Sequence, residues 1–196
     1  MDDELRSLAR RLRRESGGST EYERLLVTAD REELAAVLTA PGQPLWAREL
    51  AAFRLGGAGD RRAFESLVLL LNHRDPERCA SAAHALHELA DPRTARAAAA
   101  LATNELRVAY ALVPVRLLIR LRAPESAPAL ITVLRRRLAP GDPYRRLALA
   151  CVEGLGALGD PRARDVLTSA GTRPSLAAAA EAALARMPPA GGPAES

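Results

Sequence analysis

The stretch Gly159-Asp160-Pro161-Arg162-Ala163 joins two Ala/Leu-rich runs, and it recurs along the chain. Gly59-Asp60-Arg61-Arg62-Ala63 and Asp91-Pro92-Arg93-Thr94-Ala95 are further copies, and Ala123-Pro124-Glu125-Ser126-Ala127 is a degenerate one. The steps between copies are 31, 32 and 37 residues (60 to 91, 91 to 123 and 123 to 160). Periods of about 20 to 50 residues are typical of helical arrays. The sequence therefore predicts a repeat of paired helices.

The residue types at each junction explain how one helix ends and the next begins. Each aspartate is placed to accept hydrogen bonds from the free amides of the second helix and to face the positive end of its dipole: Asp60, Asp91 and Asp160. The prolines that follow suit the first helical position, where no amide is needed: Pro92, Pro124 and Pro161. Gly59 and Gly159 are suited to ending the preceding helix.

This frame predicts the bounds of the helices. First helices are expected at residues 44–55, 76–89, 107–121 and 143–158, second helices at 61–72, 92–103, 124–138 and 161–169, and a final helix at 175–187. Pro114 interrupts the third first helix and Pro128 the second helix after it. Since proline inside a helix removes a hydrogen bond and clashes with the preceding turn, a kink or break is expected at Pro114.

The residues before the array predict three more helices. Leu5, Leu8 and Leu12 share one face of a predicted amphipathic helix over residues 3–15, which Ser16-Gly17-Gly18-Ser19 ends. Thr20 and Asp30 each precede a glutamate by three residues, so both are predicted helix caps. The expected division is an N-terminal helix and glycine joint (1–18), a short helical extension (19–43), a repeat domain (44–187) and a disordered tail (188–196).

The composition agrees with packed helices and bounds the classes of function. Of the 196 residues 48% are hydrophobic but only 3% are aromatic, which favours an all-α fold over a sheet core. The 28 basic residues are all arginine and leave a net charge of +4, which indicates either an anionic partner or a coding bias against lysine. Cys79 and Cys151 suggest no disulfide framework. No signal peptide or membrane span is expected, so cytoplasmic localisation is predicted.

Two runs carry a family resemblance: Ala82-Ala83-His84-Ala85-Leu86-His87-Glu88-Leu89-Ala90-Asp91-Pro92-Arg93 and Val152-Glu153-Gly154-Leu155-Gly156-Ala157-Leu158-Gly159-Asp160-Pro161-Arg162-Ala163. They resemble HEAT repeats of the short bacterial type, the PBS-lyase HEAT-like repeats. The resemblance covers about residues 44–187 and implies a right-handed α-solenoid of about four repeats plus a capping half-repeat. Ala47-Arg48 is similar to the family's early Val-Arg pair, whereas Cys79 holds the arginine position in the next repeat.

The resemblance also implies a concave, partner-binding face lined by second helices. The exposed positions two and five residues beyond the caps are therefore candidates for protein binding: Arg62, Glu65, Arg93, Arg96, Arg162 and Asp165. In the third repeat, Glu125 and Pro128 hold these positions and break the row. The alternative interpretation is a solvated charged face held by local ion pairs.

A second candidate surface is basic. Five arginines flank an insert at residues 139–143 and could bind nucleic acid or another anionic polymer: Arg135, Arg136, Arg137, Arg145 and Arg146. The N-terminal helix could dock on a partner or an anionic membrane, but a role as a cap of the array is favoured over both. If one part of the chain is specialised, the divergent third repeat and its insert, between Pro114 and Arg146, are where we expect it.

No residue set predicts a reaction, a metal site or a cofactor. His73, His84 and His87 lie close together in the sequence, but they fall in surface and packing positions of the repeat. No glycine-rich phosphate loop, nucleophile elbow or metalloprotease motif is present. The sequence therefore favours a non-enzymatic protein-binding adaptor or scaffold. The alternatives are an anionic-polymer binder and a lyase-like or enzyme maturation factor, and self-association remains open.

Overall fold

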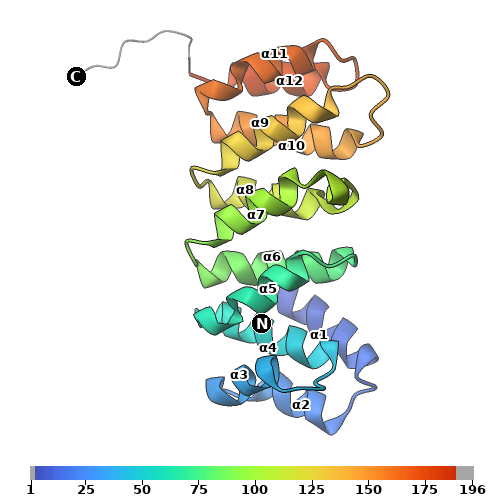
Figure 1. Ribbon diagram of the computed structural model, residues 1–196, viewed down its shortest axis with the longest axis vertical. Helices are drawn as coiled ribbons and strands as arrows, with labels where there is room; N and C mark the ends of the chain where they lie inside the picture. The colour runs from blue at the N-terminus through green and yellow to red at the C-terminus, as the bar shows by residue number, and fades with distance from the viewer. Residues whose placement is uncertain (1–2, 189–196) are drawn as a thin grey trace, which may run out of the picture. The chain divides into compact units, whose positions relative to one another are not determined.

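The computed structural model describes residues 3–188, and within this range the chain is helical and contains no strand (Figure 1). The helices pack in adjacent pairs, which confirms the predicted all-α, helical-repeat class. Of the predicted disordered tail, only Pro188 falls inside the described range; the rest, 189–196, lies outside it. The chain divides into two compact units, one ending at Thr94 and one starting at Ala95.

In the described part of the N-terminal unit there are six α-helices that end before Thr94. They are α1 (Asp3–Glu15), α2 (Thr20–Val27), α3 (Arg31–Thr39), α4 (Leu45–Gly57), α5 (Phe64–Leu71), which follows the 3-10 turn η1 (Arg61–Ala63), and α6 (Pro76–Leu89). The predicted bounds of α1 and α6 are confirmed. The buried side chains of α4 and α6 are mainly alanine and leucine, because the two helices pack against each other and against α5.

The C-terminal unit is built in the same way. Its helices are α7 (Thr94–Thr103, starting at the boundary), α8 (Leu112–Leu121) after the 3-10 segment η2 (Glu105–Tyr110), α9 (Ser126–Arg137), α10 (Arg145–Leu158), α11 (Arg164–Gly171) after η3 (Pro161–Ala163), and α12 (Ala177–Ala185). The first helices α8 and α10 lie side by side, and α12 packs on the other side of α10. The predicted final helix at 175–187 is thus shorter at both ends.

The predicted caps are present at the three intact junctions. The carboxylate of Asp60 accepts a hydrogen bond from the amide of Arg62 at 3.1 Å. Asp91 and Asp160 do the same for the amides two residues on, both at 2.9 Å. At these junctions the second helix is entered through a tight turn, so α5, α7 and α11 begin three or four residues after the aspartate. The aspartate therefore sets the direction of the second helix.

The residue before each cap position has a left-handed backbone. Gly59 and Gly159 have φ of 71° and 70°, as the prediction of glycine helix ends requires. The other two junctions place Ala90 and Arg122 in the same conformation, with φ of 52° and 51°. Side-chain-bearing residues adopt this region at a cost, so these two junctions are less well matched to their backbone.

The third repeat differs from the prediction at both prolines. The expected helix over 107–121 is broken, because η2 ends at Tyr110 and α8 begins at Leu112. Pro114 is consequently the third residue of α8, and Pro128 is the third residue of α9. A proline in the first turn displaces no intrahelical hydrogen bond. The segment is thus broken, but at Ala111 and not at Pro114 as predicted, and neither proline interrupts a helix.

Among the short helices near the N-terminus, one predicted cap is right and one is wrong. Asp30 caps α3 and accepts hydrogen bonds from the amides of Glu32 and Glu33. For α2, however, Ser19 and not Thr20 is the cap, and its hydroxyl accepts a hydrogen bond from the Tyr22 amide at 3.2 Å. Ser19 has the extended ψ of 154° that a cap requires, whereas Thr20 is already helical.

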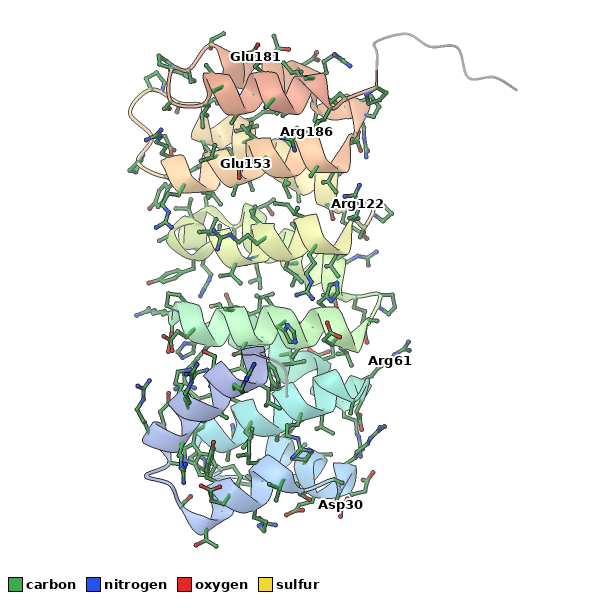
Figure 2. All side chains as sticks on the ribbon, turned by 180° about the vertical axis from the view of Figure 1, so that it is seen from behind. Asp30, Arg61, Arg122, Glu153, Glu181 and Arg186 are labelled. Carbon is green, nitrogen blue, oxygen red and sulfur yellow. The ribbon has the colours of Figure 1, made fainter. Side chains whose placement is uncertain are left out.

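The N-terminal helix α1 packs on the first helices α4 and α6 (Figure 2). Leu8 and Leu12 on its apolar face are 2% and 0% exposed. Because this face is buried inside the fold, it is occupied and does not present a free apolar surface to a membrane or a partner. The predicted capping role is therefore wrong for α1, which lies across two successive first helices, whereas α2 and α3 pack on α4.

Candidate functional site

The predicted arginines at the N-terminal unit's junctions are held between two carboxylates. The Nε of Arg62 donates to its own cap Asp60 at 3.0 Å, while its Nη1 donates to Glu32 of α3 at 2.8 Å. Arg93 repeats the arrangement with Asp91 at 3.0 Å and with Glu65 of α5 at 3.3 Å. Arg62 therefore ties the Asp60 junction to α3, and Arg93 ties the Asp91 junction to α5. We call these two three-residue clusters the arginine rungs: Glu32–Arg62–Asp60 and Glu65–Arg93–Asp91.

The charges of a rung reinforce one another. The side-chain hydrogen bonds of Arg62 and Arg93 hold the pKa of Asp60 and of Asp91 below the ordinary value for aspartate, and the backbone amides of the same arginines act in the same direction. The guanidinium of Arg93 also lies 3.8 Å above the ring of Phe64, a cation–π geometry. The rung arginines remain accessible, with 44% of the Arg62 and 54% of the Arg93 side chain exposed.

The C-terminal unit contains the remaining members of the predicted row, and they do not form rungs. Arg162 pairs with its own cap Asp160 and lowers the pKa of that carboxyl, as at the other junctions. Arg96 and Asp165 are exposed, and their side chains make no hydrogen bond or ion pair with any of residues 3–188. Of the six predicted residues, only Glu65 and Arg93 are in direct contact with each other.

The five arginines around the insert are not one free basic cluster. Arg136 and Arg137 share the carboxylate of Glu105, and Arg137 also pairs with Asp142 at 3.2 Å. Only 8% of the Arg137 side chain is exposed, and its guanidinium lies 5.6 Å from the ring centre of Tyr144. Arg145 donates to the Ser175 carbonyl at 3.5 Å. Local carboxylates thus neutralise part of the charge that an anionic polymer would need.

Exposed arginines do gather at a groove in the C-terminal unit that the sequence pattern did not reveal. The groove has a volume of about 530 Å³ and is bordered by Arg116 of α8, Arg146 of α10 and Arg186 just after α12. Glu153 of α10 is its one acidic residue, and Figure 2 labels it together with Arg186. We call it the arginine groove. Its members are distant in sequence and occupy different helices, so no single stretch indicated it.

A buried ion-pair cluster in the N-terminal unit was also missed. The side chain of Glu49 on α4 is 1% exposed and pairs with Arg11 of α1 and Arg78 of α6. The Ser81 hydroxyl donates to the same carboxylate at 3.0 Å, and Arg78 also pairs with Glu15. The one available signal was a glutamate inside the apolar face of the predicted helix at 44–55. The cluster fixes α1 on the first helices and is structural.

The contacts of His84, Cys151 and Cys79 are those of packed side chains. The ring of His84 stacks on Phe53 with centroids 5.7 Å apart. Burial raises the pKa of the Cys151 thiol to about 12, so this cysteine is protonated near neutral pH and is a poor nucleophile. Cys79 is buried and donates to the His73 carbonyl at 3.0 Å. In the part of the chain that the structure describes, no three potential metal ligands lie together.

Within residues 3–188, no helix combines the length and the apolar character that crossing a bilayer requires.

The comparisons with known proteins agree with the junction geometry. Residues 147–170 match the family model described as PBS lyase HEAT-like repeat. The match spans most of α10, the Asp160 junction and most of α11, one first helix and one second helix. No curated protein matches the chain. The same capped junction precedes α5 and α7, and other described helices pack in adjacent pairs, such as α5 with α6 and α9 with α10. Residues 147–170 are therefore similar to a PBS lyase HEAT-like repeat, and the junction geometry and packed helix pairs support a HEAT-like helical-repeat fold.

Proposed function

We propose that this protein is a non-enzymatic adaptor or scaffold that binds another protein through the exposed face of its second helices. HEAT-like repeats are in general protein-interaction elements. When repeats stack, the residues at the same position of each repeat line up in a row along the surface. The observation that carries the proposal is the pair of arginine rungs in the N-terminal unit. They place Arg62 and Arg93 at equivalent positions of successive repeats with their side chains already ordered.

Order in the free protein favours binding. A flexible arginine loses about 0.5 to 1.5 kcal/mol of side-chain freedom when a partner immobilises it, and a rung arginine has already lost most of this. Each guanidinium carries five N–H donors, so some remain for a partner's carbonyl or carboxylate. Glu32 and Glu65, with 81% and 79% of their side chains exposed, supply acceptors beside them. The face offers donors and acceptors in alternation.

The alternation favours a protein partner over an anionic polymer. Two carboxylates flank each rung arginine, so a phosphate approaching the guanidinium would also approach negative charge. A protein surface can match alternating signs with its own side chains. We assign Arg62, Glu65 and Arg93 to the binding face, and we extend the assignment to Arg96, Arg162 and Asp165 from their equivalent positions in later repeats.

The test is affinity capture from the native host with two matched charge reversals. Glu65→Lys removes the outer carboxylate of a rung without touching a cap, and Glu181→Lys makes the same change at an exposed position of α12. We expect wild type and Glu181→Lys to retain a protein partner after nuclease treatment and Glu65→Lys to lose it. Equal capture by both variants, or capture that disappears with nuclease, would refute the assignment.

A further inference from the structure

The arginine groove has the features of a site for a helix. Arg116, Arg146 and Arg186 are exposed, and none of them forms an ion pair within residues 3–188. Between them the floor is apolar, with Ile119 and Leu149 half-buried. Ala150 and Ala157 of α10 also border the groove, and the Ile119 side chain packs over the buried Gly154 between them. The floor is therefore formed by Ile119, Leu149 and small alanine side chains, on which the apolar face of another helix can rest.

The N-terminal unit shows how a helix packs on the layer formed by the first helices. There α1 lies on the first helices α4 and α6, with Leu8 and Leu12 buried and Arg11 paired to Glu49. In the C-terminal unit, the first helices α8 and α10 are not covered by a corresponding helix of the described chain. The charge differs, because the layer offers α1 both Glu49 and Arg78, whereas the groove offers three arginines and one glutamate.

We infer that the arginine groove binds an acidic amphipathic helix of a partner protein. The inference rests on the proposed adaptor function and adds a second surface and the chemistry of its ligand. Apolar side chains of the helix would contact Ile119 and Leu149, and carboxylates on both sides would pair with Arg116, Arg146 and Arg186. Glu153 favours one basic residue near the middle of that helix. Two of the three arginines lie in the Pro114 to Arg146 range that the divergent third repeat pointed to.

Charge complementarity selects this occupant over two others. A second copy of the chain would have to offer its own α1, but that helix is basic and would bring Arg6, Arg10 and Arg14 toward three arginines. Nucleic acid would match the arginines but would leave the apolar floor unused and meet the carboxylate of Glu153. Neighbouring helices lie about 8 to 10 Å apart, so a ligand crossing α8, α10 and α12 spans about 20 Å, or roughly 14 helical residues.

The test measures fluorescence anisotropy of labelled peptides with the full chain. The probe is an amphipathic peptide of about 14 residues with leucines on one face and glutamates beside them, and its controls carry lysines in place of the glutamates or a central proline. Arg116→Glu/Arg146→Glu/Arg186→Glu should weaken binding of the acidic peptide at least tenfold. Arg14→Glu/Arg31→Glu/Arg135→Glu changes the net charge equally at exposed sites elsewhere and should bind as wild type does.

A steric variant separates the groove from its charge. Ala157 is exposed, so Ala157→Phe should fold normally, as far-UV circular dichroism would verify, and should block the peptide without altering any charge. Equal binding of acidic and basic peptides, equal loss in the two triple variants, or tighter binding of single-stranded DNA would overturn the inference. If the peptide fails to bind while partner capture remains sensitive to Glu65→Lys, only the groove is refuted. If capture also fails, the adaptor function is refuted as well.

Discussion

At the residue scale, one backbone angle distinguishes the four junctions. Gly59 and Gly159 adopt the left-handed region freely, whereas Ala90 and Arg122 adopt it with a β-carbon present. The sequence predicted the glycines because glycine at a helix end is a recognised signal. It did not predict Ala90 and Arg122, since neither residue type indicates a left-handed angle. There the geometry is imposed by the repeat, which must place the next cap in the same position.

We predict that Ala90→Gly stabilises the protein and that Gly159→Ala destabilises it, each by about 1 kcal/mol, because the left-handed region costs a non-glycine residue about that much. A β-carbon at Gly159 would meet no atom within 4 Å, so the cost is conformational and not steric. Urea unfolding followed by circular dichroism measures both changes. Gly57→Ala is the control, because Gly57 also has open space around it but no positive φ; a loss of stability there as large as at Gly159 would contradict the explanation.

The caps make a second prediction about pH. The Arg93 side chain and amide hold the pKa of Asp91 below its ordinary value in the folded protein. A lowered folded pKa stabilises the protein above the unfolded value of about 3.9, and this contribution is lost as the pH falls through the folded pKa. Asp91→Asn keeps a capping side chain but removes the charge. We expect it to be less stable than wild type at pH 7, with the difference in unfolding free energy shrinking below about pH 4.

The matched variant Asp91→Ala also removes the cap, so it should cost about 1 to 2 kcal/mol and should stay less stable than Asp91→Asn at every pH. A difference in unfolding free energy between wild type and Asp91→Asn that grows on acidification would show that the carboxylate is not stabilised by Arg93.

The pairing of Arg62 with Glu32 and of Arg93 with Glu65 could not be predicted from the sequence. Each lies about one repeat earlier in the sequence, and no local pattern pairs residues at that separation.

At the element scale, the helices could be predicted from local sequence signals, except where the structure contains a turn that these signals do not indicate. The bounds of α1 and α6 were predicted because apolar spacing, caps and breakers all agree there. The third repeat was less predictable, because Pro114 and Pro128 were read as interruptions of long helices. They instead lie in the first turns of α8 and α9. The segment η2 precedes α8, and Arg107 within it has a non-helical backbone. Position within a helix, and not the presence of proline, decides its effect.

The docking of α1 makes a prediction about Glu49. Glu49→Ala would leave Arg11 and Arg78 buried beside an empty position, and breaking a buried ion pair costs about 3 to 5 kcal/mol. Both arginines keep their ion pairs with Glu15. We therefore expect Glu49→Ala to lower the free energy of unfolding by about 2 to 3 kcal/mol, which is the lower end of that range or slightly less. Glu77→Ala is the control, because Glu77 contacts Arg11 but is 72% exposed; it should change stability by less than about 1 kcal/mol. The emission of Trp46 on α4 reports this unfolding, and equal effects of the two variants would show that burial of Glu49 is not decisive.

At the scale of the whole molecule, the repeat class was predictable and the arginine groove was not. The junction at Asp160 lies in the segment that matches the HEAT-like family model, and the spacing of its copies along the sequence indicates helix pairs. The arginine groove, by contrast, depends on Arg116, Arg146 and Arg186 meeting across three helices. Repeat alignment compares equivalent positions, and these three are not equivalent. Surfaces built from such residues appear only once the helices are packed.

The division into two compact units leads to a last prediction, which uses one variant in each unit. A β-carbon at Gly156 would lie 2.7 Å from the backbone of Ala183, so Gly156→Ala overpacks α10 against α12 and should cost about 1 to 3 kcal/mol. In repeat proteins each repeat interacts mainly with its neighbours, so this loss of stability should be largest in the C-terminal unit.

The chain has a single tryptophan, Trp46 in α4, and its emission therefore follows the N-terminal unit, whereas circular dichroism follows all helices. In urea, Gly156→Ala should shift the circular dichroism transition more than the Trp46 transition, and Glu49→Ala should do the reverse. Coincident shifts of both signals in both variants would mean that the two units unfold as one.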